Sequence, residues 1–484
     1  RNPSAESVMS QPTTIVLFRN DLRLADHPAL WYAAQRGPVL PVYLRHAADS
    51  YGSAWRWWHG ESLLKLQAAL AQRGLPLLLR SGTAKAVLPE IVRASGADAV
   101  YWNRRYDRDG IAEDQELKSL FKELGVEARS FPGNLLVEPW EHLREGQPYR
   151  VFTPFWKAML ARHRFPQPLA EPESYRAPTA IPASEDLARW GWHPRDPDWS
   201  IGLARHWEVG EEAAWRRLRD FVDEGLAHYA EGRNLPGKPF VSRLSPYLAH
   251  GEISPRQIWW HLSRLAEEQG AWRRNVDAFL RELGWREFSW HLLYHFPDLP
   301  REPLRPEFQR FPWRQDPAAL RAWTRARTGY PIIDAGMREL WESGWMHNRV
   351  RMIVASFLVK DLRIPWQEGE AWFWDTLVDA DLANNSASWQ WVAGCGADAA
   401  PYFRVFNPVL QAQKFDPQGD YVRRWLPQLQ RLPADHIHAP WQAPAVVLEQ
   451  AGIALGKEYP RPLVDHHEAR EAALAAWEAI RREN

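Results

Sequence analysis

The chain has 484 residues, of which 45% are hydrophobic and 25% charged, a balance that excludes extended disorder and allows two or three domains with a large core. Its 60 basic and 60 acidic residues cancel, so the overall charge does not indicate a polyanionic partner, although it leaves a local basic groove open. The single cysteine, Cys395, excludes an internal disulfide, and no apolar run reaches the roughly 20 residues of a membrane span, so we expect a cytoplasmic protein that does not enter a membrane.

After residues 1–11, which we expect to be an extension, the first predicted elements form an α/β domain over residues 12–138. Its helical patterns lie at 61–73, 84–94 and 111–124, and they alternate with apolar runs rich in β-branched residues at 14–18, 39–44, 75–79, 99–102 and 127–131. This alternation predicts a doubly wound parallel sheet. The segment contains no G-x-G-x-x-G or Walker-type loop, so it lacks the usual dinucleotide signature of such a domain.

The pattern breaks down over residues 139–205, where proline-rich tracts indicate a long interdomain linker packed on the surface. Residues 206–484 have almost no alternating strand pattern. Helical patterns occupy 211–225, 255–269, 276–295, 334–343, 348–359 and 467–482. We therefore expect the second domain to be all-helical.

The first candidate binding segment runs from Tyr229 to the string SRLS at 242–245. Hydroxyl groups and backbone N–H groups just before a helix that begins near Pro246 can bind a phosphate, and Arg243 adds positive charge. Ser245 as a simple helix N-cap explains the same pattern equally well.

The second candidate is a carboxylate beside an indole. Glu282 and Trp285 are three residues apart in a predicted helix and therefore share a face. Such a pair can bind a flat, hydrogen-bonding ligand such as a base. The alternative is a surface glutamate above a half-buried tryptophan.

The third candidate joins residues 344–352 to Trp389-Gln390-Trp391. In a helix, Asn348 and Met352 share one face, while Arg349 is turned about 100° away. Trp389 and Trp391 are two residues apart and must point in nearly opposite directions, so that one can contact a ligand while the other packs inside. Ordinary core packing remains the alternative for each indole.

Between these two strings, residues 379–385 carry two carboxylates and two amides with no room for a large apolar face, which disfavours a core role. Cys395, His347 and the pair His466-His467 lack metal-ligand spacing, so we expect no metal site.

Together with further strings in the same order, these residues resemble the photolyase/cryptochrome family over the full two-domain length. The strings are FRNDLR at 18–23, SRLS at 242–245, WREF at 285–288, TGYP at 328–331, WMHNR at 345–349, WQW at 389–391, FRVFNP at 403–408 and KFD at 414–416. The run WRWW at 55–58 and the string YVRRWLP at 421–427 are similar to the branch nearest plant cryptochromes.

The resemblance implies a non-covalent FAD in the helical domain. Tyr229, Ser242, Arg243, Leu244 and Ser245 would hold its diphosphate arm, although Val241 departs from the threonine common at its position. Asp379 and Asp381 would hold the flavin edge and the ribose side. Arg351 would pair with Asp379, and Asn385 would lie opposite the flavin N5.

The resemblance also implies repair of cyclobutane pyrimidine dimers in DNA, because the lesion-binding positions match that enzyme. These positions are Glu282, Trp285, Asn348, Met352 and Trp391. A dimer flipped out of the duplex would lie between Trp285 and Trp391 and receive an electron from excited reduced FAD. Trp389, Trp366 and Trp313 match, in order outward, the family's chain that re-reduces oxidised FAD. The alternative is a blue-light photoreceptor that binds FAD and signals without repair.

Partners are implied at two further places. Arg233, Arg349, Arg404 and Lys414 are candidates for contacts with phosphates of the damaged DNA, and a solvated surface charge is the alternative for each. Asp107 lies near the position of an acid in folate-binding relatives, which favours methenyltetrahydrofolate as an antenna over 8-hydroxy-deazaflavin. We expect a monomer.

Overall fold

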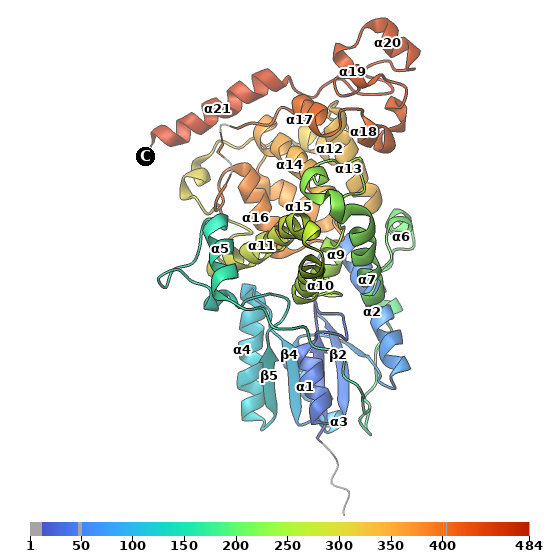
Figure 1. The fold of residues 1–484 in the computed structure, drawn as a ribbon, viewed down its shortest axis with the longest axis vertical. Helices are drawn as coiled ribbons and strands as arrows, with labels where there is room; N and C mark the ends of the chain where they lie inside the picture. The colour runs from blue at the N-terminus through green and yellow to red at the C-terminus, as the bar shows by residue number, and fades with distance from the viewer. Residues whose placement is uncertain (1–11, 47–50, 400, 403, 484) are drawn as a thin grey trace, which may run out of the picture.

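The fold combines a small α/β domain with a larger helical part, as Figure 1 shows. The computed structural model describes residues 12–46, 51–399, 401–402 and 404–483. Its sheet has five parallel strands in the order β3-β2-β1-β4-β5. The strands are β1 (Thr14–Phe18), β2 (Val39–Arg45), β3 (Leu78–Ser81), β4 (Ala99–Asn103) and β5 (Glu127–Phe131).

Helices cover both faces of this sheet because its strands alternate their side chains. Val16 and Phe18 of β1 pack on one face with α1 (Pro28–Arg36) and α2 (Ser53–Gln72). Ile15 and Leu17 of the same strand pack on the other face with α3 (Ala84–Ser95) and α4 (Arg108–Glu123). The predicted doubly wound sheet is confirmed.

Several predicted boundaries in this domain are wrong, among them the starts of β3 and α2. The third strand begins at Leu78, not at residue 75, because Leu75 and Leu77 are buried without pairing to β2. Helix α2 begins at Ser53, eight residues before the predicted start. Its first turns carry the string WRWW, whose Trp55, Trp57 and Trp58 are almost fully buried, so no amphipathic period marks that end of the helix.

The stretch predicted as a patternless linker contains a helix that belongs to the core. Helix α5 (Phe152–Arg162) buries Phe152, Phe155, Trp156 and Met159 against the long helix α11 (Arg273–His295). A Cβ atom at Gly284 of α11 would lie 2.7 Å from the Trp156 ring, so glycine permits this close packing. A short helix, α6 (Ile201–His206), follows. The domain boundaries at 138 and 205 stay a prediction.

The helical part is built from short and medium helices around α11 and the helix pair α13 and α14 (Figure 1). Its helices are α7 (Glu211–Asp220), α8 (Tyr229–Gly232), α9 (Ser245–Ala249), α10 (Pro255–Glu268), α12 (Pro317–Thr324), α13 (Pro331–Ser343), α14 (Asn348–Ser356), α15 (Trp366–Thr376), α16 (Leu382–Ala393), α17 (Pro408–Phe415), α18 (Asp420–Trp425), α19 (Ala434–Ile437), α20 (Ala445–Gln450) and α21 (His466–Arg482). π-helical turns at Phe221–Gly225 and Phe357–Asp361 continue α7 and α14.

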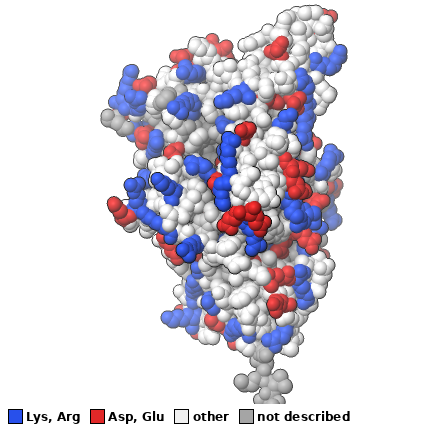
Figure 2. Space-filling view, viewed as in Figure 1, with Lys and Arg blue, Asp and Glu red and all other residues white. Residues whose placement is uncertain are grey.

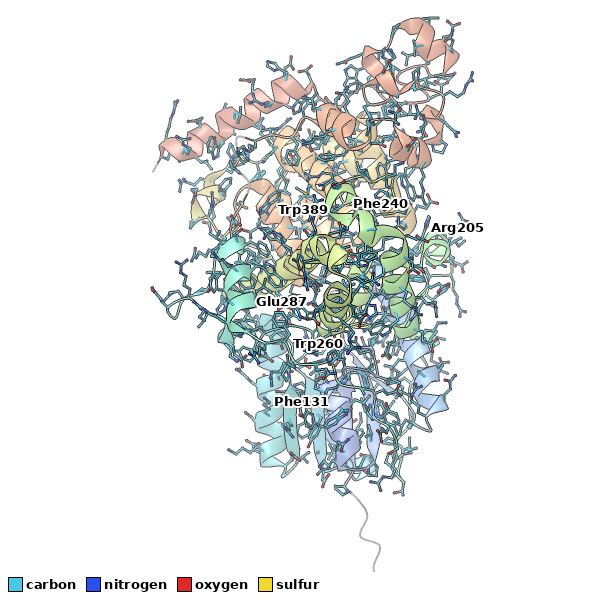
Figure 3. The ribbon with its side chains drawn as sticks, in the orientation of Figure 1. Phe131, Arg205, Phe240, Trp260, Glu287 and Trp389 are labelled. Atoms are coloured by element: carbon cyan, nitrogen blue, oxygen red, sulfur yellow. The ribbon has the colours of Figure 1, made fainter. Side chains whose placement is uncertain are left out.

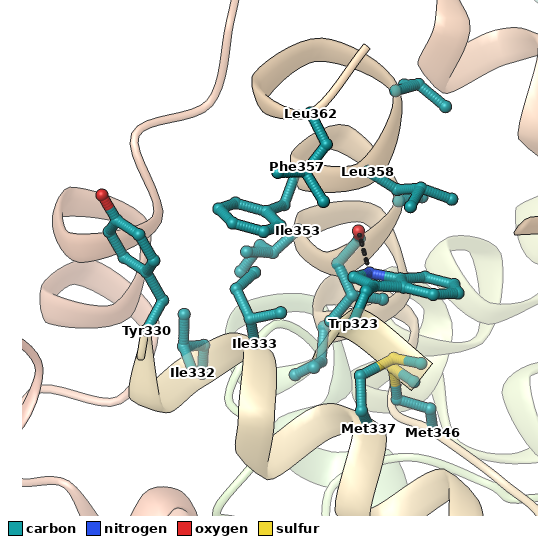
Figure 4. Packing of buried hydrophobic residues seen from close by; sticks show 14 of the residues in the cluster. Trp323, Tyr330, Ile332, Ile333, Met337, Met346, Ile353, Phe357, Leu358 and Leu362 are labelled. Atoms are coloured by element: carbon teal, nitrogen blue, oxygen red, sulfur yellow. Dashed lines mark hydrogen bonds between the residues drawn. The ribbon is translucent and has the colours of Figure 1, made fainter. Parts of the chain in front are cut away.

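One large core joins these helices. In Figure 4, Ile333 of α13 faces Ile353 and Phe357, while Met337 of the same helix lies beside Met346. The Trp323 indole donates a hydrogen bond of 3.0 Å to the carbonyl of Val354. The predicted all-helical second domain is confirmed. Over the described ranges, no helix combines the length and the apolar character needed to cross a bilayer.

Candidate functional site

Helix α14 is the centre of the candidate site, and its start is fixed by a histidine. The Nδ1 atom of His347 accepts the backbone N–H of Arg349 at 3.1 Å. Burial lowers the pKa of His347 to about 3, so the ring is neutral and keeps this acceptor. Asn348 and Met352 lie one turn apart, with 4.0 Å between the Asn348 amide nitrogen and the Met352 sulfur. The predicted shared face is confirmed.

Arg351 points away from that face into a polar cluster. Its Nη1 and Nη2 atoms donate to the two carboxylate oxygens of Asp379 at 3.2 and 2.7 Å, which confirms the predicted pair. The hydroxyl of Ser245 donates to the same carboxylate at 2.6 Å and accepts the indole N–H of Trp345 at 3.0 Å. Because Asp379 is only 7% exposed, these donors hold a buried negative charge.

The segment before α9 forms a basic turn. Arg243 has a left-handed φ of 56°, and its guanidinium carbon lies 4.9 Å from the centroid of the Trp345 ring. The hydroxyl of Ser242 accepts the N–H of Leu244 at 3.2 Å. Ser245 is the first residue of α9 and not its N-cap, so the simple capping alternative for this residue is wrong.

Tyr229 lies at the start of α8. It is 5% exposed and packs edge-on against Phe221 and Phe279. The guanidinium carbon of Arg233 lies 5.9 Å from the Tyr229 ring. Of the predicted diphosphate residues, Tyr229 and Leu244 therefore belong to one hydrophobic cluster, which also contains Trp345.

Glu282 and Trp285 lie on α11 with separate partners. Glu282 forms an ion pair with Arg233, with 2.7 Å between the carboxylate oxygen and the guanidinium nitrogen. One face of the Trp285 ring stacks on Phe152 of α5, with 3.9 Å between the centroids and 10° between the planes. Because Phe152 is fully buried and Trp285 is partly exposed, the uncovered part of the indole is available to a ligand.

The two tryptophans of α16 differ in burial as the spacing predicted. Trp389 is 2% exposed and packs edge-on against Phe373, whereas Trp391 is only partly buried. Figure 3 shows Trp389 within the helical part. A Cβ atom at Gly369 of α15 would lie 2.2 Å from Cη2 of Trp389, so glycine lets α15 pack directly on this indole. One turn away on α16, the Asn385 amide donates to the carbonyl of Glu370 at 3.0 Å.

The other two tryptophans of the predicted electron path belong to the same core. Trp366 begins α15 and is 1% exposed, while Trp313 is partly buried and packs against Phe311, with 4.4 Å between the centroids. Trp313 is the most exposed of the three indoles, whereas Trp389 and Trp366 are equally buried, so burial places Trp313 at the outer end but does not order the other two. Their role stays a prediction.

Asp381 lies at a cavity between the two parts of the molecule. It caps α16 by accepting the N–H of Asn384 at 2.8 Å, and it accepts the indole N–H of Trp290 at 3.2 Å. Burial raises the pKa of Asp381. The cavity measures about 460 Å³ and is also lined by Asp107 and Trp374.

Asp107 has two partners besides this cavity. It caps α4 through the N–H of Gly110 at 3.1 Å and pairs with Arg105 at 3.0 Å. Burial acts to raise the pKa of Asp107, but Arg105 and the Gly110 N–H outweigh it, so the pKa lies below its usual value. Asp107 therefore stays ionised at the cavity wall.

The predicted DNA contacts have different surroundings. Arg349 donates to the Asn234 side chain at 3.2 and 3.3 Å and lies over the Phe415 ring, 4.5 Å from its centroid. Lys414 is exposed and approaches the same ring at 5.2 Å. Arg404 is exposed and lies in a loop. Its backbone carbonyl accepts a hydrogen bond of 3.3 Å from the buried Lys360 side chain. On the face shown in Figure 2, basic and acidic side chains are interspersed.

Several site residues escaped the sequence analysis. Asn234, Phe152 and Gly369 contact predicted residues but come from segments distant in the chain, so no local spacing could reveal them. Phe415 stood within the string KFD without a role. Phe403, in the string FRVFNP, lies outside the described residues. Within the described part of the chain, no group of three or more histidine, cysteine, aspartate or glutamate side chains could hold a metal ion.

The chain is similar to known proteins over nearly its whole length. Residues 14–173 match the family profile described as DNA photolyase, and residues 279–479 match the FAD binding domain of DNA photolyase. The chain is 50% identical over 471 residues to the deoxyribodipyrimidine photo-lyase of Agrobacterium fabrum, and this alignment covers 97% of this chain and 98% of that protein. It is 38% identical to cryptochrome-1 of Arabidopsis thaliana, covering 96% of this chain and 70% of that protein. The crystal structure of a bacterial class III photolyase from Agrobacterium tumefaciens superposes with a TM-score of 0.96 at 48% identity, covering 99% of this chain and 100% of that one.

Proposed function

The chain belongs to the photolyase/cryptochrome family, and from this membership we propose that it is a deoxyribodipyrimidine photo-lyase, an enzyme that uses light to split pyrimidine dimers in DNA. The observation that carries the proposal is a pair of contacts around α14. Arg349 of α14 donates a hydrogen bond to Asn234. Arg233, the residue before Asn234, forms an ion pair with Glu282 of α11. Together with the Asn348–Met352 contact, they bring the lesion-binding candidates of two helices to one region.

The donor set around α9 and α14 fits FAD. A diphosphate needs cations and hydroxyl or N–H donors, which Arg243, Ser242 and the turn before α9 provide. The buried Asp379, held by Arg351 and Ser245, provides a fixed carboxylate for N–H donors of a bound ring. When bound, FAD supplies the light-driven electron that the reaction needs.

The residues of the lesion site have separable tasks in this proposal. Trp285, supported from behind by Phe152, and Trp391 provide aromatic surface for a flipped-out dimer. Met352 provides an adaptable apolar contact. The carboxylate of Glu282 accepts N–H groups of the bases and holds the bases in place. The amide N–H groups of Asn348 donate to base oxygens and stabilise the negative charge that develops on them.

The decisive experiment measures repair directly. Purified protein with reduced FAD is illuminated with blue light in the presence of an oligonucleotide that carries one thymine dimer. We expect loss of the dimer under light and no loss in the dark. An unchanged dimer after illumination of FAD-loaded, reduced protein would refute the proposal.

The second candidate function is a blue-light photoreceptor, which the 38% identity to cryptochrome-1 favours. A photoreceptor of this kind would reduce its FAD under light but leave the dimer intact. The same illuminated sample therefore distinguishes the two functions when dimer loss and flavin absorbance are followed together.

For the interdomain cavity we propose an antenna pigment. Asp107 and Trp374 line its wall, and a space of about 460 Å³ is of the size that a folate headgroup needs. Methenyltetrahydrofolate is the proposed pigment, and 8-hydroxy-deazaflavin is the alternative. An absorption spectrum of the purified protein separates them, since a strong near-ultraviolet band favours the folate and a strong blue band the deazaflavin. Damaged DNA is the proposed partner. The monomeric state and the cytoplasmic location stay predictions.

A further inference from the structure

The side chain of Arg349 is oriented by two residues that have no role in the proposed reaction. Its Nε and Nη2 atoms both donate to Oδ1 of Asn234, at 3.3 and 3.2 Å. One face of the guanidinium lies over the Phe415 ring, with 4.5 Å between the guanidinium carbon and the ring centroid. Neither contact uses Nη1. The guanidinium is thus fixed in one plane with a donor edge left over.

This arrangement gathers positive charge without an equal negative charge beside it. Burial and the neighbouring Arg233 lower the pKa of Arg349, as expected when a cation is partly desolvated next to another. Lys414 approaches the same Phe415 ring at 5.2 Å. Arg233 pairs with Glu282, but Asn234 is neutral and cancels no charge. Holding like charges together costs free energy, and an anion bound beside them would offset that cost.

We propose that Asn234 and Phe415 are positioning residues that orient Arg349 toward a backbone phosphate of the damaged DNA. The inference rests on the proposed function, because it requires Arg349 to meet a phosphate. A neutral amide oxygen suits this task, since it fixes the planar guanidinium through two N–H groups and leaves the full positive charge for the phosphate. The aromatic ring fixes the plane without competing for a donor.

The test measures binding of a thymine-dimer oligonucleotide by the FAD-loaded protein over a range of KCl concentrations. The variants are Asn234→Ala, Phe415→Leu, Arg349→Ala and the double variant Asn234→Ala with Arg349→Ala. Asn275→Ala is the matched control. Asn275 also anchors the chain near α8, through the N–H of Ala230 at 2.8 Å and the carbonyl of Ala227 at 3.1 Å, and makes no contact with Arg349. FAD content and repair yield at saturating DNA are measured for each.

We expect Asn234→Ala to raise the dissociation constant about tenfold and to reduce the salt slope by up to about one, as Arg349→Ala does. Phe415→Leu should show a smaller change in the same direction. The double variant should bind no more weakly than Arg349→Ala, because both changes remove one contact. FAD content should stay at the wild-type level in every variant, and Asn275→Ala should bind and repair as the wild type does.

Three results overturn the inference while leaving the proposed function intact. In the first, Asn234→Ala binds the oligonucleotide as the wild type does although Arg349→Ala binds it weakly. In the second, the losses of affinity add in the double variant. In the third, Asn275→Ala loses as much affinity as Asn234→Ala. If Arg349→Ala binds DNA with the wild-type dissociation constant and salt slope, Arg349 does not contact a phosphate, and the inference is refuted as well. Repair by that variant would then show that the proposed function survives without this contact.

Discussion

Arg233, in the loop after α8, and Glu282, on helix α11, form an ion pair of 2.7 Å. The two side chains are 30% and 29% exposed. The two residues were predicted for different partners, Arg233 for DNA and Glu282 for the lesion. Their pairing means that the carboxylate is already oriented before a substrate arrives, and that lesion binding must share or replace this contact. A half-buried pair of this kind is screened less than a surface pair.

The first prediction concerns Glu282→Ala. The variant loses the proposed hydrogen bonds that the carboxylate accepts from the bases and that orient them in the site, so the repair yield should fall about tenfold. Light-driven reduction of the flavin should proceed at the wild-type rate, because Glu282 does not take part in it. The two quantities are measured on the same sample by dimer loss and by flavin absorbance.

Glu231→Ala is the matched control for that experiment. Glu231 also pairs with an arginine, Arg274 at 3.1 Å, but its side chain is 80% exposed. Its removal takes away one negative charge from the same region and should leave the repair yield unchanged. An unchanged yield in Glu282→Ala would remove Glu282 from the lesion site.

The second prediction concerns Gly369→Ala on α15. The added Cβ atom would lie 2.2 Å from the Trp389 ring, closer than any real contact, so the indole or the helix must move. Overpacking of this kind costs about 1–3 kcal/mol of stability. Because the Trp389 ring is the first of the proposed electron path, a change in its packing should also slow the photoreduction of oxidised FAD. Urea unfolding and the rate of photoreduction measure the two effects.

Gly60→Ala provides the comparison, since a Cβ atom there would meet no atom closer than 3.6 Å. This variant should keep the photoreduction rate, and its unfolding midpoint should rise slightly because alanine is favoured over glycine inside a helix. If Gly369→Ala has the same unfolding midpoint and photoreduction rate as Gly60→Ala, the tight packing of α15 on Trp389 affects neither stability nor electron transfer.

Local pattern predicted the sheet well because its strands are short and those at its centre, β1 and β4, are fully buried. β1 and β5 have the predicted bounds. β3 does not, since hydrophobicity at Leu75 and Leu77 reports burial and not strand pairing. Helix α5 was missed although Phe152, Phe155, Trp156 and Met159 follow helical spacing, because the surrounding prolines suggested a linker.

In the site, sequence spacing could predict contacts within one helix but not between segments. Asn348 and Met352 are four residues apart, and their contact follows from helical geometry. The pairing of Arg351 with Asp379 was predicted only through the family resemblance. Asn234 and Arg349 are separated by 115 positions, and no periodicity relates them. The Phe152–Trp285 stack likewise depends on how α5 packs on α11.

The third prediction separates repair from photoreduction through Trp389→Phe. Phenylalanine fills most of the space of the indole but is much harder to oxidise, so the variant should lose most of the light-driven reduction of oxidised FAD. Protein whose flavin is reduced chemically beforehand should repair dimers at the wild-type yield. The control is Trp260→Phe on α10, a partly exposed indole at 37%, which should change neither quantity. Fast photoreduction in Trp389→Phe would contradict the proposed path.

The fourth prediction is a pH dependence that originates at Glu252. Burial raises the pKa of this carboxyl to about 8 from a usual value of 4.5, although Trp58 and Ser62 donate to it at 2.7 and 3.0 Å and partly oppose the shift. Between pH 4.5 and 8 the folded protein therefore holds a proton that the unfolded chain has lost. Unfolding releases this proton, so the contribution of Glu252 to stability falls as the pH rises through that window, by about 1.4 kcal/mol per pH unit.

Glu252→Gln should abolish this term, because a neutral amide keeps an oxygen for the Trp58 indole and has no proton to lose. The stability of the variant relative to the wild type, measured by urea unfolding, should rise steadily from pH 5 to pH 8 and then level off. Glu212→Gln, at a side chain that is 95% exposed, controls for the loss of one negative charge and should show a constant difference from the wild type. Because other buried groups titrate in both proteins, the test lies in the difference between variant and wild type. A difference that stays flat across this window would mean that Glu252 is ionised in the folded protein, and its bonds to Trp58 and Ser62 would then be those of a buried carboxylate.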